Sequence, residues 1–359
     1  MLRRAVVIGA GLIGTSIALA LREHEIEVAL ADRDPATLRL ASELGAGTAL
    51  DPDTAGPPAD IAVIAAPPAV VAHLLYDAQE RGLAHVYTDA ASVKASLVDQ
   101  ASQLGCDLTT YVPAHPMGGS EKHGPSAARA DLFLGRPWAV CPTGKAKPEA
   151  VALVMELARM CGADPMRIDA HTHDQAVALV SHAPHVAAAA VAARLVDGDS
   201  ETLALCGQGV RDVTRVAGGD PTLWTEILRH NPLPVAEVLE AVAADLAGVA
   251  QGLRAGADPP HPDVRDLLER GRSGCARLPG KHGAHRTPDY TVVPVVIPDE
   301  PGALGRLFAA AGEAECNIED VQIDHSPGRP VGVAQLSVMP ATADVLAREL
   351  SKRGWSVHA

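Results

Sequence analysis

Aromatic side chains are scarce in this sequence. Only 3% of the 359 residues are Phe, Trp or Tyr, although 47% of the residues are hydrophobic. A chain of this length can form two or three domains with a sizeable interior. Because large rings are nearly missing, we expect that interior to consist mainly of Ala, Val and Leu.

An excess of positive charge is also missing. The formal net charge is −14 at pH 7, whereas general nucleic-acid binders present a basic face to the phosphates. The charge therefore argues against a nucleic-acid-binding protein. If the substrate is an anion, local cations must overcome the field of the whole chain.

The cysteines and the apolar segments lack the patterns of zinc-binding, membrane-spanning and secreted proteins. The six cysteines are scattered, with no CxxC pair and no zinc-type spacing, so we expect buried thiols in a reducing compartment. No apolar stretch approaches the ~20 residues that a membrane helix needs. The apolar run after Arg4 contains glycines that fit a nucleotide-binding unit better than a signal peptide. We expect a cytoplasmic protein without a membrane partner.

The N-terminal segment has the pattern of a dinucleotide-binding unit. A β-rich run from Arg4 to Ile8 precedes a GxGxxG motif, and helical apolar spacing follows from Thr15 to Arg22. In this motif the first glycine permits a tight turn, the second lets backbone approach a pyrophosphate, and the third allows close helix–strand packing. The helix N-terminus then faces the phosphates. The motif consists of Gly9, Ala10, Gly11, Leu12, Ile13 and Gly14.

A second predicted strand, from Glu27 to Ala31, ends at an acidic residue. Asp32 lies 18 residues beyond Gly14, where a carboxylate accepts hydrogen bonds from the adenosine ribose and favours NAD over NADP. Arg33 complicates this interpretation, because an Arg side chain can accommodate a 2′-phosphate. Further cofactor contacts are expected after the strand that ends at Ala65, from Ala66 and Pro67, and after the next strand, from Ser92.

The order of the predicted elements indicates three domains. Strands and helices alternate up to residue 169, which predicts an α/β, Rossmann-type doubly wound parallel sheet. Strand signals then vanish, and Asp174–Val196, Leu203–Val216, Pro221–His230 and Pro234–Leu253 read as Ala-rich or amphipathic helices. The last part has a βαββαβ order, typical of a ferredoxin-like α+β module. The predicted segments are 1–169 for the dinucleotide, 170–277 for substrate and dimerisation, 278–288 as linker, and 289–359 as the α+β domain.

The segment between residues 89 and 124 concentrates reactive side chains: Ser92, His115, Glu121 and Lys122. Each half of it follows a strand-like run, and α/β sheets bind ligands at the carboxyl ends of their strands. We expect His115 to emerge on a Pro/Gly-rich loop as an acid or base, because His titrates near neutral pH. The alternative is that His115 caps a strand and packs beneath a loop.

The helical region holds a histidine pair and an arginine pair. His182 and His185 are three residues apart, but no HExxH motif or suitably spaced third ligand accompanies them, so we expect no metal site. Arg211 and Arg215 are four residues apart and therefore share one face of a helix. That face is either solvated or binds an anion.

Together these motifs resemble the prephenate dehydrogenase (TyrA) family over essentially the first 275 residues. Each motif is weak alone, but their combination is highly specific. Besides GxGxxG, the motifs are Asp89-x-x-Ser92-Val93-Lys94, His115-Pro116-Met117-x-Gly119-x-Glu121-Lys122, His173-Asp174, Ser181-His182-x-Pro184-His185, and Arg211-Asp212-x-Thr214-Arg215 followed by Asp220-Pro221 and Trp224.

The resemblance implies a reaction and roles for these residues. The family oxidatively decarboxylates prephenate to 4-hydroxyphenylpyruvate with NAD⁺, in tyrosine biosynthesis. His115 corresponds to the base that accepts the proton of the 4-hydroxyl, and Ser92 orients that hydroxyl. The remaining implied substrate contacts are Arg215 on a carboxylate, Arg211 and His185 nearby, Trp224 closing the pocket, and Glu121 and Lys122 beside it.

The C-terminal part resembles an ACT domain, an amino-acid-binding regulatory module. The signature is Asp299-x-Pro301-Gly302-x-Leu304-x-x-Leu307, with Asn317-Ile318 at the start of the next strand. The resemblance implies a homodimer and a small-molecule effector, of which the pathway product tyrosine is the obvious candidate. The implied effector contacts are Gly302, Ala303, Leu304, Asn317 and Ile318.

Other functions stay open at this point. Some relatives oxidise arogenate, and a relative acting on 4-amino-4-deoxyprephenate would share these motifs. A β-hydroxyacid dehydrogenase is disfavoured, since its catalytic Lys would lie in the helical domain and no Lys occurs between Lys147 and Lys281. A non-catalytic NAD and amino-acid sensor would not need to retain Ser92, His115 and Arg215.

Overall fold

The chain forms two compact units, Met1–Ala244 and Asp245–Ala359. The computed structural model describes residues 2–50, 57–118, 123–256, 262–278, 290–325 and 330–358. The predicted linker, residues 278–288, therefore lies almost entirely outside the described residues, as do Glu121 and Lys122.

The first unit begins with a six-stranded parallel sheet of strand order β3-β2-β1-β4-β5-β6. This confirms the predicted Rossmann-type sheet. The strands are β1 (Arg4–Ile8), β2 (Glu27–Ala31), β3 (Thr48–Ala49), β4 (Ala59–Ile64), β5 (Ala84–Asp89) and β6 (Tyr111–Val112). The helices are α1 (Leu12–Glu23), α2 (Pro35–Glu43), α3 (Pro68–Glu80), α4 (Ala95–Gln103) and α5 (Pro148–Met160).

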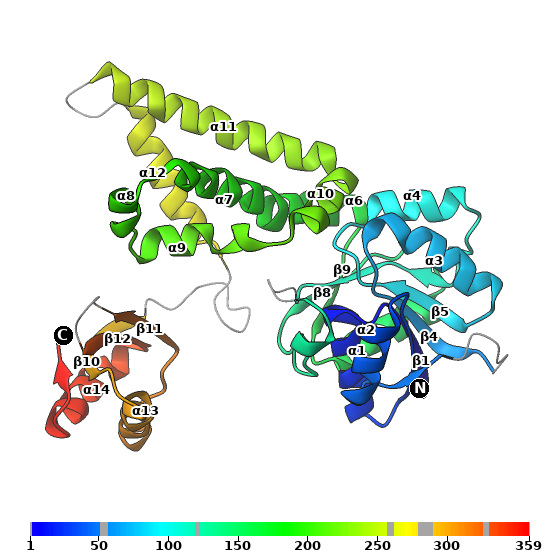
Figure 1. Ribbon diagram of the computed structural model, residues 1–359, viewed down its shortest axis with the longest axis horizontal. Coiled ribbons are helices and arrows are strands. Elements are labelled where there is room, and N and C mark those ends of the chain that lie inside the picture. The colour runs from blue at the N-terminus through cyan, green and yellow to red at the C-terminus, as the bar shows by residue number, and fades with distance from the viewer. Residues whose placement is uncertain are drawn as a thin grey trace. The chain divides into compact units, whose positions relative to one another are not determined.

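Alternate residues of the central strands point to opposite faces of this sheet. Val7 and Val63 belong to a buried cluster with residues of α1 and α5, whereas Val6 and Ile64 belong to a second cluster with residues of α3 and α4. Figure 1 shows α1 on one side of the strands and α3 on the other. Both clusters are rich in Ala, Val, Leu and Ile, as the composition predicts.

The strands after Val112 leave the parallel sheet, so the prediction of one continuous sheet is wrong. A separate sheet contains β7 (Ala114–Pro116), β8 (Pro137–Val140) and β9 (Asp164–Arg167), with β7 antiparallel to β8. Pro113 separates β6 from β7, and proline has no N–H to continue a ladder. A 3₁₀ turn, η1 (Pro125–Ala127), lies between β7 and β8.

The described part of the helical region, 170–256 and 262–275, contains no strand. Its elements are α6 (Ala170–Val177), η2 (Ala178–His182), α7 (Ala183–Ala193), η3 (Arg194–Asp197), α8 (Ser200–Ala204), α9 (Gln208–Thr214), η4 (Arg215–Gly218), α10 (Pro221–His230), α11 (Pro232–Ala255) and α12 (Pro262–Cys275). The single helices predicted over Asp174–Val196 and Leu203–Val216 are both interrupted. In the first, η2 is a π-helical segment, because the ring of Pro184 blocks the regular bond to the carbonyl of Val180.

The helical stretch Ala170–Asp197 is 28 residues long, and its most apolar 18-residue window has a mean hydropathy of 1.6. The expectation that no apolar stretch approaches the length of a membrane helix is therefore wrong by length and composition. Core helices of soluble proteins meet the same criterion. Within this stretch His173, Asp174, His182 and His185 are buried.

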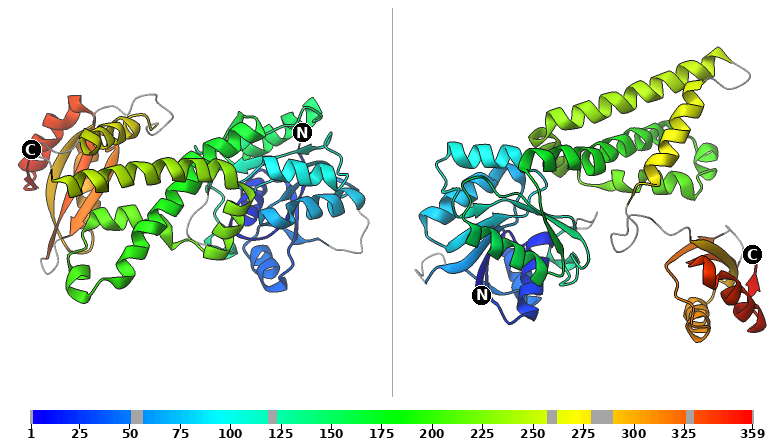
Figure 2. Two further views of the ribbon diagram at one scale, coloured as in Figure 1. Left: turned by 90° about the horizontal axis from the view of Figure 1, so that it is seen from above. Right: turned by 180° about the vertical axis from the view of Figure 1, so that it is seen from behind.

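The tail of the second unit shows the predicted βαββαβ order, and its four strands form an antiparallel sheet of order β11-β12-β10-β13. Alternate residues of β10 enter a core with residues of both helices, and the two helices pack on one face of the sheet (Figure 2). The elements are β10 (Thr291–Pro298), α13 (Ala303–Glu313), β11 (Asp320–His325), β12 (Val331–Val338), α14 (Pro340–Lys352) and β13 (Ser356–Val357).

Candidate active site

The loop after β1 requires glycine at two of the three motif positions. Gly9 has φ +103°, and a Cβ atom there would lie 2.2 Å from the carbonyl oxygen of Ala65. A Cβ atom on Gly14 would lie 1.9 Å from the carbonyl oxygen of Gly9. At Gly11, in contrast, no heavy atom lies within 4 Å of the Cβ position. The middle glycine thus keeps open space beside the N-terminus of α1, where a pyrophosphate needs close backbone approach.

Asp32 follows β2 and is tied to this loop. Its carboxylate accepts hydrogen bonds from the backbone N–H of Ala10, at 2.7 Å, and of Asp34, at 2.9 Å. Leu12 and Ile13 form the first turn of α1. Ala66 and Pro67 follow β4 beside Ala65, and the side chain of Arg33 is exposed. The predicted cofactor residues in the loops therefore follow the carboxyl ends of β1, β2 and β4 and, for Ser92, of β5.

A buried ion pair supports the segment between β5 and α4. The Lys94 ammonium and the Asp89 carboxylate are fully buried and hydrogen-bonded to each other. The carboxylate also accepts from the Tyr111 hydroxyl, at 2.7 Å, and Lys94 Nζ donates to the Ala114 carbonyl, at 2.7 Å. Burial, and then the negative charge of Asp89, hold the pKa of Tyr111 well above its usual value. These bonds fix the backbone next to His115.

His115 lies in β7 opposite Ala139, not on a loop as predicted. Its Nδ1 atom is 3.0 Å from Nε2 of His173, with the rings edge-on at a centroid distance of 5.2 Å. Nδ1 of His173 is 2.8 Å from Oδ1 of Asp174. The Asp174 carboxylate also accepts from the backbone N–H groups of Lys94 and Ala95, both at 2.8 Å. His115 is thus connected through α6 to the N-terminus of α4.

The imidazole of His115 is held in its neutral form. Burial lowers its pKa well below 6.5, and the nearby His173, Lys94 and His182 side chains lower it further. A neutral imidazole can accept a proton at neutral pH, which a general base requires. Ser92 is half-buried in the loop between β5 and α4, two residues before Lys94.

A second cluster surrounds Trp224 of α10. The ring of His185 stacks on Trp224 at a centroid distance of 3.5 Å and an interplanar angle of 13°. A Cβ atom on Gly219 would lie 2.5 Å from Nε1 of Trp224, so glycine is needed for this packing. The segment η4, which begins at Arg215, packs against α7. His185, Trp224 and the Arg215 segment, far apart in sequence, therefore belong to one cluster.

Contrary to the prediction, the two arginines do not lie on one face of a single α-helix. Arg211 lies in α9, but the α-helix ends at Thr214, and Arg215 begins the 3₁₀ segment η4. Both side chains are exposed. In the part of the chain that the structure describes, neither guanidinium pairs with a carboxylate.

Four residues of this site received no individual role from the sequence: His173, Asp174, His182 and Asn231. Nδ2 of Asn231 donates to the Asp174 carbonyl, at 2.7 Å, and to Nδ1 of His182, at 3.2 Å. Burial lowers the pKa of His182 to about 4. The adjacent His173-Asp174 pair was already conspicuous in the sequence as one of the family motifs. No local signal marked Asn231, because its partners are 49 and 57 residues away.

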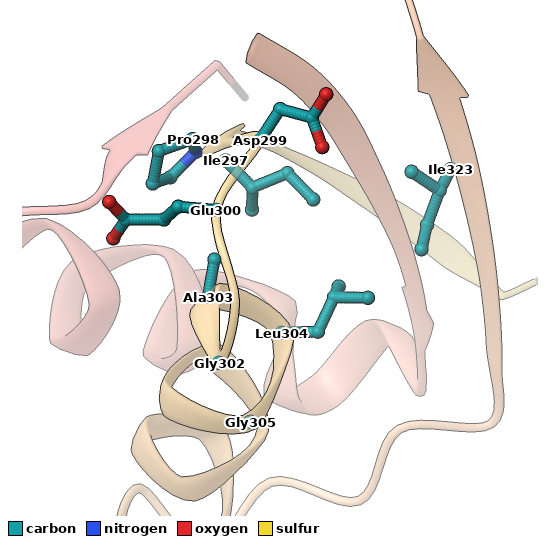
Figure 3. Close-up of a pocket in the computed structure, with 9 residues that line it drawn as sticks. All are labelled: Ile297, Pro298, Asp299, Glu300, Gly302, Ala303, Leu304, Gly305 and Ile323. Atoms are coloured by element: carbon teal, nitrogen blue, oxygen red, sulfur yellow. The ribbon is translucent and has the colours of Figure 1, made fainter. Parts of the chain in front are cut away.

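The tail has a cavity of about 210 Å³ at the junction of β10 and α13, shown in Figure 3. Three predicted effector residues, Gly302, Ala303 and Leu304, line it. Gly302 caps α13 with φ +83°, a left-handed conformation that favours glycine. Leu304 and Ile323 lie on one side of the loop, and the Glu300 carboxylate points to the other (Figure 3).

The other two predicted effector residues, Asn317 and Ile318, do not line this cavity. The Asn317 side chain instead donates to the Glu319 carboxylate, at 2.7 Å.

Comparison with known proteins decides the family. The family model "Prephenate dehydrogenase, nucleotide-binding domain" matches residues 17–166, and "Prephenate dehydrogenase, dimerization domain" matches residues 169–266. The chain belongs to the prephenate dehydrogenase family. It is 40% identical over 365 aligned positions to "Probable prephenate dehydrogenase NovF" of Streptomyces niveus, covering 100% of both chains.

Two further relatives agree with this family. The chain is 27% identical to the prephenate dehydrogenase of Lactococcus lactis, covering 98% of each chain. The match to the crystal structure of Synechocystis arogenate dehydrogenase covers 76% of this chain and 98% of that chain, with a TM-score of 0.63 and 26% identity. The two family models contain His115 and His173, and the match to the Streptomyces niveus protein, which covers the whole chain, also includes the glycine loop before residue 17.

Proposed function

We propose that this protein is an NAD-dependent prephenate dehydrogenase, which oxidatively decarboxylates prephenate to 4-hydroxyphenylpyruvate in tyrosine biosynthesis. The observation that carries the proposal is a neutral, half-buried His115 hydrogen-bonded through His173 to Asp174, in a member of this family. Such a histidine can take the proton of the substrate hydroxyl as the carbonyl forms. The domain boundaries 1–169, 170–277, 278–288 and 289–359 are part of the proposal.

The cofactor assignment rests on the loop after β1 and on Asp32. The open space at Gly11 admits a pyrophosphate, and the Asp32 carboxylate, anchored on Ala10 N–H, retains lone pairs for ribose hydroxyls. The same negative charge opposes a 2′-phosphate, which favours NAD. When bound, the nicotinamide supplies the hydride acceptor.

The substrate is a dianion, and the arginine segment supplies the cations. We propose that Arg215 binds a substrate carboxylate, with Arg211 and His185 beside it and Trp224 closing the pocket. The support is the exposure of both arginines next to the His185–Trp224 stack. Charge-assisted, bidentate hydrogen bonds suit a carboxylate. Ser92 would orient the hydroxyl, and Glu121 and Lys122, outside the described residues, keep their predicted places in the proposal.

Arogenate is the second candidate substrate, because the structural relative from Synechocystis, with 26% identity, is an arogenate dehydrogenase. 4-Amino-4-deoxyprephenate is a third. The experiment is a set of initial rates with each of the three compounds, each with NAD⁺ and with NADP⁺. We expect the highest kcat/KM with prephenate and NAD⁺. If no pair of substrate and cofactor is turned over, the dehydrogenase assignment is refuted and a sensor that binds NAD and an amino acid is favoured.

We further propose a cytoplasmic homodimer. The matched family model for residues 169–266 is a dimerization domain. Leu179 and Val180, 61% and 62% exposed, and Val191, 46% exposed, present apolar side chains that a second copy would cover. All six cysteines are free thiols; four of them are buried as expected, whereas Cys206 is half-buried and Cys275 is exposed.

Finally, we propose that the tail is an ACT domain that binds an amino-acid effector, with tyrosine as the first candidate. The support is the cavity at Gly302, beside the N-terminus of α13, where backbone N–H groups attract a carboxylate. Coupling between two such sites is typically ~1–3 kcal/mol, or 5–150-fold. Tyrosine should alter the activity of the full chain, and a chain without residues 290–359 should not respond. Because tyrosine resembles the product, an identical response of both chains would indicate competition at the active site and refute the regulatory role.

A further inference from the structure

Three N–H groups converge on the carboxylate of Asp174. Two are backbone donors, Lys94 N–H and Ala95 N–H, at the start of α4, and the third contact is Nδ1 of His173, at 2.8 Å. The side chain of Asp174 is only 5% exposed, so its partners lie within the protein. A carboxylate at a helix N-terminus is stabilised in its ionised form, which only accepts hydrogen bonds.

This environment sets the direction of the hydrogen bonds around His115. Since Asp174 accepts, Nδ1 of His173 must carry a hydrogen and donate. A neutral imidazole has one N–H, so Nε2 of His173 is then an acceptor. Nδ1 of His115, 3.0 Å away, must therefore donate to it. The remaining nitrogen of His115, Nε2, is left with a free lone pair.

We infer that His173 and Asp174 are positioning residues that hold His115 in the tautomer whose Nε2 atom accepts the proton of the substrate hydroxyl. This inference rests on the proposed dehydrogenase function. The backbone of β7 is held separately, because Lys94 Nζ donates to the Ala114 carbonyl. Strand position and ring tautomer are thus controlled by different contacts.

The proton balance of the reaction follows from this arrangement. Nε2 of His115 takes the hydroxyl proton as the C–O bond becomes a carbonyl and hydride leaves the same ring carbon for the nicotinamide. The ring carboxylate departs as CO₂, and the electron pair of the broken bond completes the aromatic ring and leaves a phenolate. The His115 imidazolium, which donates from Nδ1 to His173, then returns its proton to that oxygen.

The reverse direction of the hydrogen bond between His115 and His173 predicts a different tautomer of His115. If His173 were an imidazolium, both of its nitrogens would donate, and Nδ1 of His115 would have to accept. The hydrogen of His115 would then sit on Nε2, and His115 could not act as a base there. The two arrangements differ in an observable property, the tautomer of His115.

The first test uses kinetics of three variants of the full-length enzyme. His173→Leu removes the acceptor for His115, and kcat should fall by about 10²-fold or more, as expected when a base loses its tautomer. His173→Gln can accept from His115 and donate to Asp174, so it should recover about tenfold of that loss. His171→Gln, an exposed change on the same helix, is the matched control and should leave kcat unchanged.

A double-mutant cycle separates positioning from a general structural effect. In the background of His115→Asn the base is absent, so His173→Leu should change kcat by less than about threefold. An undiminished loss in that background, or a His173→Leu enzyme within about threefold of wild type, would overturn the inference.

The second test does not depend on turnover. Long-range ¹H–¹⁵N spectra of histidine-labelled protein at neutral pH report tautomers directly, and His115→Asn identifies the relevant signal. We expect the Nδ1–H tautomer of His115 in the wild type and its loss in His173→Leu. An Nε2–H tautomer or an imidazolium in the wild type would refute the inference. If no substrate is oxidised, the proposed function fails, while this spectrum still decides the tautomer.

Discussion

The surroundings of His115 and of Arg215 differ in how completely the folded chain occupies their polar groups. His115, His173, Asp174, Lys94 and Asp89 form one connected set of hydrogen bonds, and the last four are at most 4% exposed. Arg211 and Arg215, in contrast, are exposed on short helical segments.

This contrast separates two tasks of one site. A base must already have the correct tautomer and orientation before the substrate arrives, because reorganisation during reaction raises the barrier. A cation that binds a carboxylate loses part of its strength if the protein already neutralises it. The fold therefore fixes the proton-accepting histidine through internal partners of its Nδ1 atom and leaves the anion-binding arginines without them.

The largest expected effect is on catalysis. His115→Asn keeps the approximate size of the side chain but cannot accept the proton, so kcat should fall ~10²–10⁴-fold with a modest change in KM. Steady-state kinetics with the best substrate measure this effect. A change confined to KM would show that His115 binds substrate without acting as a base.

Removal of the Lys94 ammonium tests the buried hydrogen-bond network around His115. Lys94→Met leaves the Asp89 carboxylate buried without its cation, and such changes destabilise by about 3–5 kcal/mol. Denaturant unfolding should show this loss, whereas Lys145→Met, at an exposed position, should not. Combining Lys94→Met with Asp89→Asn should recover part of the stability. If the double variant is less stable than Lys94→Met alone, the ion pair is not the reason.

Removal of the Arg215 guanidinium tests the exposed, anion-binding part of the site. Arg215→Ala removes a charge-assisted hydrogen bond, worth about 1.5–3 kcal/mol, so KM should rise about 10–10²-fold while kcat changes little. Arg194→Ala, also exposed in the helical region, is the control for net charge. A fall in kcat without a rise in KM would assign Arg215 to the chemical step instead.

A smaller effect is expected at the cofactor. Asp32→Ser removes the charge that opposes a 2′-phosphate and retains a hydroxyl acceptor for Ala10 N–H, so the preference for NAD⁺ should narrow by about tenfold. Adding Arg33→Ala to this variant should then weaken the binding of NADP⁺ again. A wild-type enzyme that uses both cofactors equally would contradict the assigned role of Asp32.

The smallest effect concerns pH. Because burial lowers the pKa of His115 below 6.5, the folded enzyme resists protonation there, and the acid limb of kcat/KM should lie below pH 6.5. The nearby His173, Lys94 and His182 side chains act in the same direction. The linked stability is present above the unfolded pKa and is lost as pH falls below it. An acid limb above pH 6.5 would contradict this assignment.

Much of the fold was predictable because its signals are local. The β1 and β2 boundaries agree with the predicted runs Arg4–Ile8 and Glu27–Ala31, since buried parallel strands are short continuous apolar segments. The interruption of the long helix at η2 was not predicted, although Pro184 marked its cause. The separation of β7–β9 from the main sheet was also missed, because strand pairing joins residues far apart in sequence.

The sequence by itself determined the nucleotide-binding loop, the order of the elements and the identities of the reactive residues. These depend on spacing and on residue type, as with the glycines from Gly9 to Gly14. Only the tertiary structure decided that Asp174 caps α4 and that His173 contacts His115, which is 58 residues away. A hydrogen bond depends on distance and direction in space, and neither is encoded by any local pattern. The tautomer of His115 is therefore a property of the folded chain.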